Sequence, residues 1–199
     1  MAIHYMGLRI ETSEDVYEPA EDTFLLAEVL IKEVRPQDIV LDMGTGTGIL
    51  ALLAAKRAKF VIGADISKEA VELAWKNSKI NGIDNAIFVV SNLFENLRGQ
   101  FDLIVFNPPY LPGEDYEIRG DIDKALIGGP QGGEVIVRFF NQVTDFLKPQ
   151  GRILLVYSSL TKPSPTEVAQ KRGFFTKVIA KKKLFFEELY VMIAELSSR

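Results

Sequence analysis

The stretch VLDMGTGTG, residues 40–48, joins a short apolar run at 39–42 to a longer apolar run that begins at Ile49. An apolar run followed at once by glycines is typical of a buried strand that turns tightly into a helix. The glycines have the spacing G-x-G-x-G, which differs from the G-x-G-x-x-G of dinucleotide-binding proteins. The stretch therefore predicts a βα turn whose backbone a ligand can approach closely.

Strands and helices alternate on both sides of this turn. Strands are expected at 39–42, 60–65, 86–90, 101–106 and 152–157, and helices at 19–34, 49–58, 68–81, 133–147 and 166–171, with a turn at 149–151. Two β-rich runs, about 174–182 and 188–195, close the chain without a helix between them. The pattern predicts an α/β fold with a Rossmann-like sheet of seven strands, mostly parallel, with an antiparallel C-terminal hairpin and helices on both faces. Such an ending is typical of seven-stranded methyltransferase sheets.

The composition excludes several kinds of site. The chain has no cysteine, so it has no disulfide, thiolate nucleophile or Cys-based zinc site, and we expect no metal site. The one histidine, His4, lies near an N-terminus that we expect to be mobile, which makes it a poor candidate for a general base. The net charge is -4, and the one clear basic run is Lys181, Lys182 and Lys183. Proteins held to nucleic acid by phosphate contacts usually carry more basic surface than this.

Acidic and amide side chains follow the first three predicted strands. Asp42 stands just before the glycines, where a carboxylate suits the amino group of S-adenosylmethionine and would repel a pyrophosphate. Asp65 ends the second strand and can accept hydrogen bonds from both ribose hydroxyls. Alternatively Asp65 caps the next helix, a role for which Ser67 competes. Asn92 and Leu93 follow the third strand, where an amide can meet the adenine edge and an apolar side chain can pack on the ring. We therefore predict S-adenosylmethionine as the cofactor; a glycine-rich turn without a ligand is the alternative.

The sequence Asn107-Pro108-Pro109-Tyr110 directly follows the fourth predicted strand. An amide or aromatic amine nitrogen is a poor nucleophile because its lone pair is delocalised, so a catalyst must orient that lone pair and accept hydrogen bonds from the N–H groups. The Asn107 side-chain oxygen and the Pro108 carbonyl can accept them, and the prolines stiffen the loop. Tyr110 can stack on the planar group. The pattern predicts methyl transfer to a planar nitrogen, with Asn107, Pro108 and Tyr110 as catalytic residues and Pro108, Pro109 and Tyr110 as substrate-binding residues; an ordinary Asx-Pro turn is the alternative.

Several stretches together resemble the HemK-like glutamine N5-methyltransferases. They are DVYEPAEDTFLL at 15–26, the glycine motif, NPPY at 107–110 and ALIGGPQGG at 125–133, and the resemblance spans nearly the whole chain. Members of this family modify the Gln of the GGQ motif in class I translation release factors. The opening stretch resembles the eukaryotic and archaeal branch, whereas the bacterial branch carries an extra N-terminal helical domain for which we expect no room here.

The resemblance also implies which residues bind the ligands. It implies that the cofactor is contacted by Thr23, Asp42, Gly44, Asp65, Asn92, Leu93 and Asn107, and the glycine motif adds Gly46. It implies that Asn107, Pro108 and Tyr110 hold the target amide and that residues 128–133 line the substrate side. Position 92 is commonly Asp in the family, and Asn92 changes the donors and acceptors offered to adenine. Residues 111–124 are variable in such proteins, so no substrate contact is assigned to them.

Two protein partners follow from the resemblance. One is a class I release factor as the substrate, and the other is a small zinc-binding methyltransferase activator that forms a heterodimer by covering an apolar edge. The strand expected at 86–90 is of a kind that a partner could extend. We expect one methyltransferase domain over 1–199, with 1–36 as an N-terminal segment that covers substrate and cofactor.

The chain carries neither of two common signals for a membrane or secretory location. No apolar run approaches the roughly 18 residues that cross a membrane. The N-terminus also lacks the basic-then-apolar order of a signal peptide. A cytoplasmic location is therefore expected, without a membrane partner.

Two other functions are compatible with parts of this pattern. An adenine-N6 or guanine-N2 methyltransferase of DNA or RNA would share NPPY, because an exocyclic amine poses the same chemical problem and the base is flipped out of its stack. Such enzymes usually add a target-recognition domain or a basic surface, and neither is evident in this sequence. A non-catalytic methyltransferase-like scaffold would not need the intact glycine motif and NPPY that this chain retains.

Overall fold

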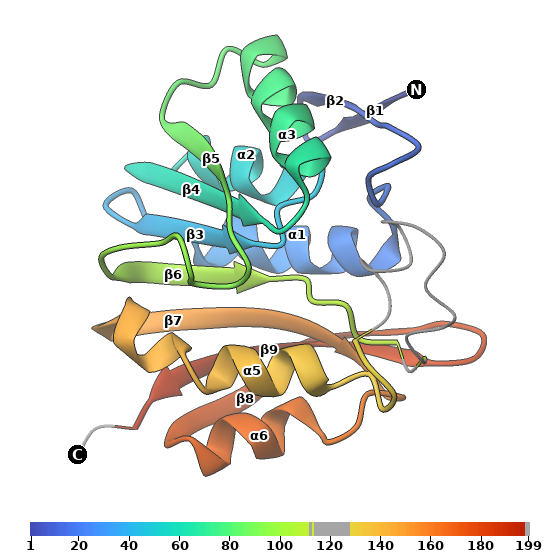
Figure 1. Ribbon diagram of the computed structural model, residues 1–199, viewed down its shortest axis with the longest axis vertical. Coiled ribbons are helices and arrows are strands. Elements are labelled where there is room, and N and C mark those ends of the chain that lie inside the picture. The colour runs from blue at the N-terminus through green and yellow to red at the C-terminus, as the bar shows by residue number, and fades with distance from the viewer. Residues whose placement is uncertain (112, 114–127, 198–199) are drawn as a thin grey trace.

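The computed structural model describes residues 1–111, 113 and 128–197. Its centre is a seven-stranded sheet in the order β5-β4-β3-β6-β7-β9-β8 (Figure 1). In chain order the strands are β3 (Ile39–Met43), β4 (Phe60–Asp65), β5 (Ala86–Val90), β6 (Phe101–Phe106), β7 (Leu147–Ser158), β8 (Phe174–Lys183) and β9 (Glu188–Leu196). Strands β3 to β7 pair in parallel, and β9 runs antiparallel to both β7 and β8. The predicted mostly parallel sheet with an antiparallel C-terminal hairpin is confirmed.

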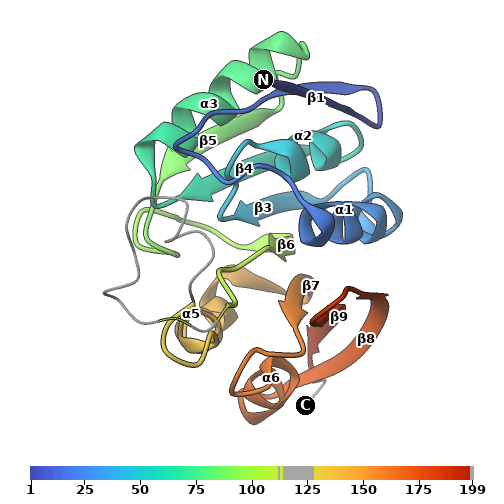
Figure 2. The same cartoon turned by 90° about the vertical axis from the view of Figure 1, so that its right-hand side faces the viewer.

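Helices cover both faces of this sheet. They are α1 (Glu21–Glu33), α2 (Ile49–Ala55), α3 (Lys68–Ile80), α5 (Glu134–Phe140) and α6 (Pro165–Lys171), with a 3₁₀ turn η2 at Val143–Phe146. Figure 2 looks toward the carboxyl ends of the parallel strands and shows α1, α2 and α3 on one face and α5 and α6 on the other. No helix in the described part of the chain combines the length and the apolar character needed to cross a bilayer.

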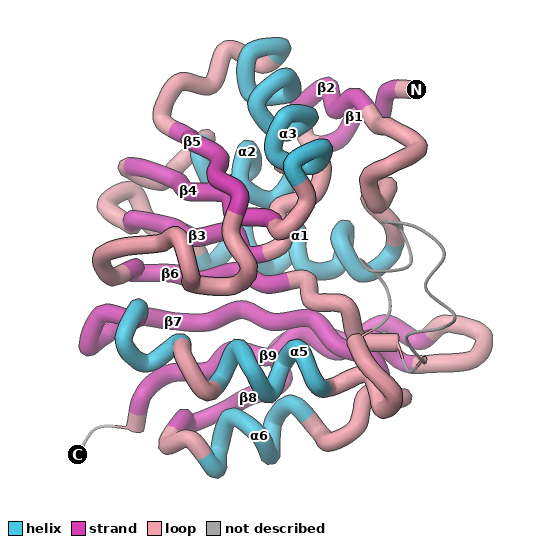
Figure 3. The backbone as a smooth tube through the Cα atoms, in the orientation of Figure 1, coloured by secondary structure: helices cyan, strands magenta, loops and turns pink. Residues whose placement is uncertain are grey.

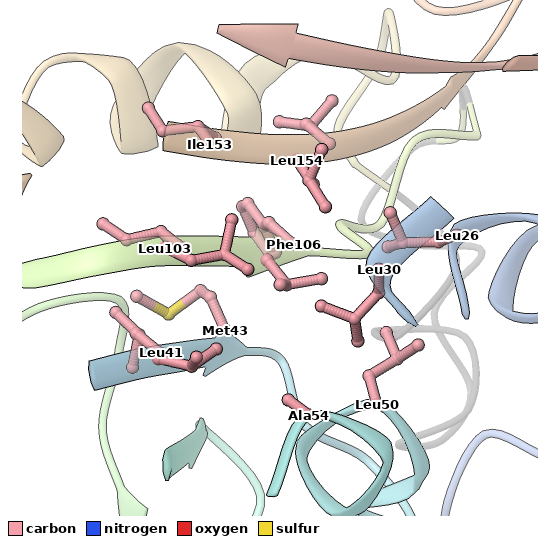
Figure 4. Packing of buried hydrophobic residues seen from close by; sticks show 14 of the residues in the cluster. Leu26, Leu30, Leu41, Met43, Leu50, Ala54, Leu103, Phe106, Ile153 and Leu154 are labelled. Atoms are coloured by element: carbon pink, nitrogen blue, oxygen red, sulfur yellow. The ribbon is translucent and has the colours of Figure 1, made fainter. Parts of the chain in front are cut away.

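The core forms where the central strands are buried on both faces. Leu41 of β3, Leu103 of β6 and Leu154 of β7 are inaccessible to solvent, as expected for parallel strands covered by helices. Figure 4 shows Leu26 and Leu30 of α1 between Leu50 of α2 and the β7 side chains. Burial of each such side chain contributes about 1.5–3 kcal/mol, so this layer holds the strand ends that carry the candidate site in a fixed arrangement.

The N-terminus departs from the sequence prediction. Ala2–Tyr5 (β1) and Leu8–Glu11 (β2) form an antiparallel hairpin in which His4 pairs with Arg9, so the expectation of a mobile terminus is wrong for these residues. The hairpin docks on α3 because Asn77 accepts a hydrogen bond from the Glu11 N–H (2.8 Å) and donates one to the Glu11 carbonyl (3.0 Å). Asn81 does the same with the backbone of Arg9. The two asparagine side chains thus bond to the backbone of β2 as a neighbouring strand would. No local sequence pattern could reveal this pairing.

The predicted helix at 133–147 and the turn at 149–151 are also corrected. Helix α5 ends at Phe140, the chain tightens into η2, and β7 begins at Leu147. Residues 149–151 lie within β7, where the pairing to β6 shifts from Phe101 with Leu147 to Leu103 with Arg152. The Pro149-Gln150-Gly151 sequence, which indicated a turn, instead forms part of β7, where it coincides with a shift in the pairing to β6.

A buried ion pair joins β7 to Asp38, the residue before β3, and its contribution to the stability of the fold can be tested. Arg152 is 2% exposed and donates to Asp38 Oδ2 at 2.7 Å and to the Glu33 carbonyl at 2.8 Å. We predict that Arg152→Met lowers the free energy of unfolding by about 3 kcal/mol, because it leaves the Asp38 carboxylate buried without its cation. Urea denaturation followed by circular dichroism measures this.

The matched control is Lys148→Met. Lys148 pairs with Asp102 at 2.7 Å, but the two side chains are 36% and 26% exposed. Its loss should cost less than about 1 kcal/mol because solvent screens the pair. Equal effects of the two substitutions would contradict the role given to Arg152.

Candidate functional site

A cavity of about 650 Å³ opens at the carboxyl ends of β3, β4, β5 and β6. Its walls come from the loops that follow these strands, with Arg138 and Val135 of α5 on one side. Asp15, Val16, Tyr17 and Pro19 also line it, which places part of the N-terminal segment at its rim. Because the site forms where parallel strands end, it occupies the usual ligand position of open α/β sheets.

The glycine motif forms the floor of the cavity. Gly44 and Gly46 line it and have φ angles of 68° and 52°, a left-handed conformation that favours glycine. Gly48, with φ 83°, begins α2, and a Cβ there would lie 2.9 Å from the Cβ of Ala74. The G-x-G-x-G spacing therefore has two structural reasons. Gly44 and Gly46 form a turn whose backbone faces the cavity, and Gly48 allows α2 to pack closely against α3.

Asp42 is buried directly behind this turn. Its Oδ2 accepts hydrogen bonds from Thr45 Oγ1 (2.7 Å) and the Ala51 N–H (3.0 Å), while Oδ1 is buried and has no partner among the described residues. Burial raises the pKa of the Asp42 carboxyl to about 7. Gly44 and Thr45 line the cavity in front of it. A cation placed in the cavity would favour the charged form of Asp42, and a pyrophosphate would disfavour it.

Asp65 lines the cavity at the end of β4. Its Oδ2 accepts from the Gly46 N–H (2.9 Å) and its Oδ1 from the Ser67 N–H (3.0 Å). Ser67 is the N-cap of α3, with its Oγ accepting from the Ala70 N–H at 3.1 Å, so the capping role considered for Asp65 belongs to Ser67. Burial raises the pKa of Asp65. Asp65 thus links the glycine turn to β4 and keeps acceptor capacity toward the cavity.

Asn92 and Leu93 line the cavity after β5, and their contact with adenine stays a prediction. Leu93 is buried with a φ of 50°, an uncommon conformation for a leucine. The Asn92 amide donates to Glu95 Oε1 (2.9 Å), and its oxygen accepts from Arg138 Nη2 (3.1 Å). Arg138 was missed by the sequence analysis because a single arginine in a mostly apolar helix belongs to no motif, and only the fold brings it beside Asn92.

The buried carboxylate of Asp22 organises the reactive side of the cavity. Asn107 Nδ2 donates to Asp22 Oδ2 and to Thr23 Oγ1, both at 3.2 Å. The hydroxyls of Tyr110 (3.0 Å) and Tyr17 (3.2 Å) donate to the same carboxylate. Because a carboxylate only accepts hydrogen bonds, Asn107 must turn its NH₂ toward Asp22. Its Oδ1 is left buried without a partner among the described residues, as an acceptor for another group.

Asp22 had no assigned role in the sequence analysis. It lies 85 residues before Asn107, inside an acidic run that reads as a solvated segment. The one available signal was its place in the stretch 15–26 that resembles the HemK-like enzymes.

The remaining NPPY residues are divided between the cavity and the core. Pro109 lines the cavity, whereas Pro108 and Tyr110 are buried and are not among its described lining residues. Tyr110 is tied through its hydroxyl to Asp22, and its contact with a substrate stays a prediction. Gly128 packs against this loop, because a Cβ there would lie 2.4 Å from the Pro109 carbonyl oxygen. Residues 125–127 and most of 111–124 lie outside the described residues.

The comparisons with known proteins agree with this geometry. Residues 16–186 match the family described as Methyltransferase small domain. A putative protein N5-glutamine methyltransferase of Methanocaldococcus jannaschii is 41% identical over 197 residues, 98% of each chain. The chain belongs to the HemK-like N5-glutamine methyltransferases. It is an enzyme of the methyltransferase class, and the non-catalytic alternative is set aside.

Other HemK-like relatives span different shares of the chain. The mouse methyltransferase HEMK2 is 37% identical to this chain. The matched region is 77% of this chain and 76% of HEMK2. The release factor glutamine methyltransferase of Deinococcus radiodurans is 36% identical to this chain. The matched region is 88% of this chain and 66% of that protein.

Solved structures show the same fold. A chain from the E. cuniculi Mtq2–Trm112 complex, responsible for methylation of the translation termination factor eRF1, superposes with a TM-score of 0.75 at 30% identity, covering 92% of this chain and 99% of that one. A tRNA m1G37 methyltransferase of M. jannaschii has a TM-score of 0.74 at 20% identity, covering all of this chain and 57% of that one. The latter likeness concerns the fold alone.

The hydrogen bonds of Asp22 generate a prediction about turnover. Asp22→Ala should lower the rate of methyl transfer about 100-fold, because it frees the Asn107 amide to rotate and misplaces its oxygen. Cofactor affinity should change less than about threefold. Single-turnover assays with labelled S-adenosylmethionine, together with calorimetry, separate the two effects.

Glu18→Ala is the control, since Glu18 is exposed in the same segment and is not among the described residues of the cavity wall. A rate for Asp22→Ala equal to that of this control would show that Asn107 does not need Asp22.

Proposed function

We propose that this chain transfers the methyl group of S-adenosylmethionine to the side-chain amide of the Gln in the Gly-Gly-Gln loop of a class I translation release factor. The observation that carries the proposal is the orientation of Asn107: its NH₂ is held by Asp22, and its Oδ1 is a buried acceptor with no partner among the described residues. Relatives named as protein N5-glutamine and release factor glutamine methyltransferases support the same substrate. Translation termination would place the protein in the cytoplasm.

The residues around the cavity suit S-adenosylmethionine. Asp65 would accept hydrogen bonds from the ribose hydroxyls, and Asn92 and Leu93 would meet the adenine. The turn at Gly44 and Gly46 would let the methionine portion approach the backbone, with Thr23 beside it and the charge of Asp42 behind. When bound, the cofactor supplies an electrophilic methyl group on its sulfonium. The buried, unpartnered Oδ1 of Asp42 fits a cationic ligand.

The chemistry required of the protein is positioning. Asn107 Oδ1 would accept a hydrogen bond from one N–H of the target amide, and the Pro108 carbonyl would accept one from the other. Two directed acceptors rotate the amide so that its nitrogen lone pair, delocalised in the ground state, faces the methyl donor. The nitrogen becomes acidic as it forms its new bond, so no strong base is required and the proton can leave to water. This accounts for a site built without histidine or cysteine.

The surface favours a protein substrate over nucleic acid. The basic run at 181–183 is partly neutralised, because Lys182 forms an ion pair with Glu21 and Lys181 with Glu188. The net charge of the chain is -4.

We further propose that an activator protein docks along β5. This strand pairs with β4 on one side, and no described strand pairs with its other edge. Val90 of β5, Trp75 of α3 and Ile66 are exposed apolar side chains in this part of the chain. An open edge with adjoining apolar groups suits extension of the sheet by a partner strand. The related Mtq2 chain was solved as a complex with Trm112; zinc binding by a partner of this chain remains an expectation from the family resemblance.

The substrate assignment predicts a specific labelling pattern. Labelled cofactor should methylate a class I release factor, and Gln→Ala in its Gly-Gly-Gln loop should remove the label. The assay is run with and without a candidate activator, followed by mass spectrometry of the loop peptide. Equal labelling of both loops, or labelling of DNA or RNA instead, would show that the substrate is wrong.

Cofactor affinity should depend on pH through Asp42. Its pKa is raised to about 7 in the free protein. The amino group of S-adenosylhomocysteine should favour the carboxylate, so binding releases a proton below pH 7. The dissociation constant should then rise by up to about tenfold for each pH unit below 7 and level off above it. Calorimetry from pH 5.5 to 8.5 measures the slope, and Asp42→Asn should remove it. The same slope in the variant would assign the titration to another group.

The docking proposal predicts that Val90→Glu prevents an activator from co-purifying, because it places a charge beside the open edge. Phe175→Glu, on the opposite edge strand β8, is the matched control and should retain the partner. Loss of the partner from both variants would mean that β5 is not the docking edge.

A further inference from the structure

The turn between β8 and β9 carries two exposed aromatic side chains. Phe185 and Phe186 are 92% and 86% exposed, with ring centroids 4.7 Å apart in an edge-to-face arrangement. The Leu184 N–H donates to the Glu187 carbonyl at 2.8 Å, which closes the turn around them. Turns usually hold Gly, Pro, Asn, Asp or Ser at such positions. Two phenylalanines that remain in solvent contribute little to the stability of the fold, so another role has to account for them.

The residues that flank the two rings hold the turn in place through contacts with the core and with the N-terminal segment. Leu184 packs against the hydrophobic core, and Glu187 Oε2 is buried. Burial is the main cause of the raised pKa of the Tyr17 and Tyr110 hydroxyls, and the nearby charge of Glu187 raises the pKa of both further. Lys182, near the end of β8, forms an ion pair with Glu21, the residue next to Asp22. The turn is therefore held next to the N-terminal segment that carries Asp22.

A second set of contacts links the turn end of this hairpin to the NPPY loop. Glu188 and Ser159 exchange hydrogen bonds at 2.8 and 3.0 Å. Thr161, two residues later, donates from Oγ1 to the Tyr110 carbonyl at 3.2 Å. Figure 3 shows the loop between β8 and β9 extending past the carboxyl ends of β6 and β7, on the side of the sheet where NPPY begins. The turn that carries the two rings thus lies on the same side of the sheet as the start of the reactive loop.

We propose that Phe185 and Phe186 form a docking element for the folded part of the protein substrate that flanks its Gly-Gly-Gln loop. This inference rests on the proposed function and adds where the substrate body binds. A Gly-Gly-Gln loop offers one side chain to the cavity, so the loop alone presents few groups for affinity. A pair of exposed aromatic rings on the cavity side of the sheet is the kind of contact that dominates protein interfaces. It would bind an apolar patch on the substrate and keep the loop near Asn107.

Other occupants of this surface are less consistent with the structure. A membrane-binding loop usually adds several basic side chains to its aromatic ones. Here Lys182 and Lys181 are engaged by Glu21 and Glu188. Two rings are also too small a surface for a stable dimer, whose partners each bury about 800 Å². The link to the NPPY loop favours the substrate.

The test compares the double variant Phe185→Ser, Phe186→Ser with the wild type. For the release factor, KM should rise about tenfold or more, while kcat at saturating substrate should stay within about twofold. Binding to a release factor with Gln→Ala in its loop should weaken by the same factor. The affinity for S-adenosylhomocysteine should not change. Phe175→Ser is the matched control, since this β8 residue is 64% exposed and pairs with Glu195 at the other end of the hairpin.

Each alternative result is distinguishable. An unchanged KM in the double variant, or an equal rise in the Phe175→Ser control, would overturn the docking role and leave the proposed function standing. A fall in kcat with unchanged KM would also overturn it, because the turn would then act on the site itself. Vesicle binding or dimerisation lost in the double variant, without a change in KM, would assign the rings to a membrane or to a second copy. Absence of labelling by the wild type would instead overturn the proposed function.

Discussion

The hydrogen bonds received by one buried carboxylate, that of Asp22, hold the reactive half of the site together. Thr23, Tyr17, Tyr110 and Asn107 all donate to it, so the N-terminal segment, α1 and the NPPY loop share a single acceptor. A carboxylate buried in this way is stable only when its acceptors are satisfied. The need to satisfy Asp22 therefore dictates which end of the Asn107 amide faces the cavity, and with it the chemistry that the site can perform.

The cofactor half of the site depends on backbone geometry more than on side chains. The glycine turn bends tightly after β3, and Asp65 secures it through the Gly46 N–H. Asp42 stands behind the turn as a buried charge with an open oxygen. At the rim of this half, the Asn92 amide is held between Arg138 and Glu95.

The C-terminal hairpin lies at one edge of the sheet and contacts the segment that supports the reactive half of the site. Its strands complete the sheet, and the first residue of β9, Glu188, is hydrogen-bonded to the segment 159–161 that supports Tyr110. In a protein whose proposed target is a short loop with one reactive side chain, recognition must extend beyond the cavity. Both edges of the sheet then have a use, with β5 open to an activator and the β8–β9 turn facing a substrate.

The sequence by itself determined the alternation of strands and helices along the chain, the glycine turn and the presence of an Asn-Pro-Pro-Tyr loop at the end of a strand. These features follow from constraints that act over a few neighbouring residues, such as apolar runs and left-handed glycine angles. Only the tertiary structure decided that the N-terminal hairpin docks on Asn77, that residues 149–151 continue a strand, and that Asp22, Arg138 and Glu187 reach the site. Their partners lie 46, 66 or 85 residues away in the chain. A charged residue on a helix or in a turn reads as solvated until the fold places an acceptor or a donor beside it.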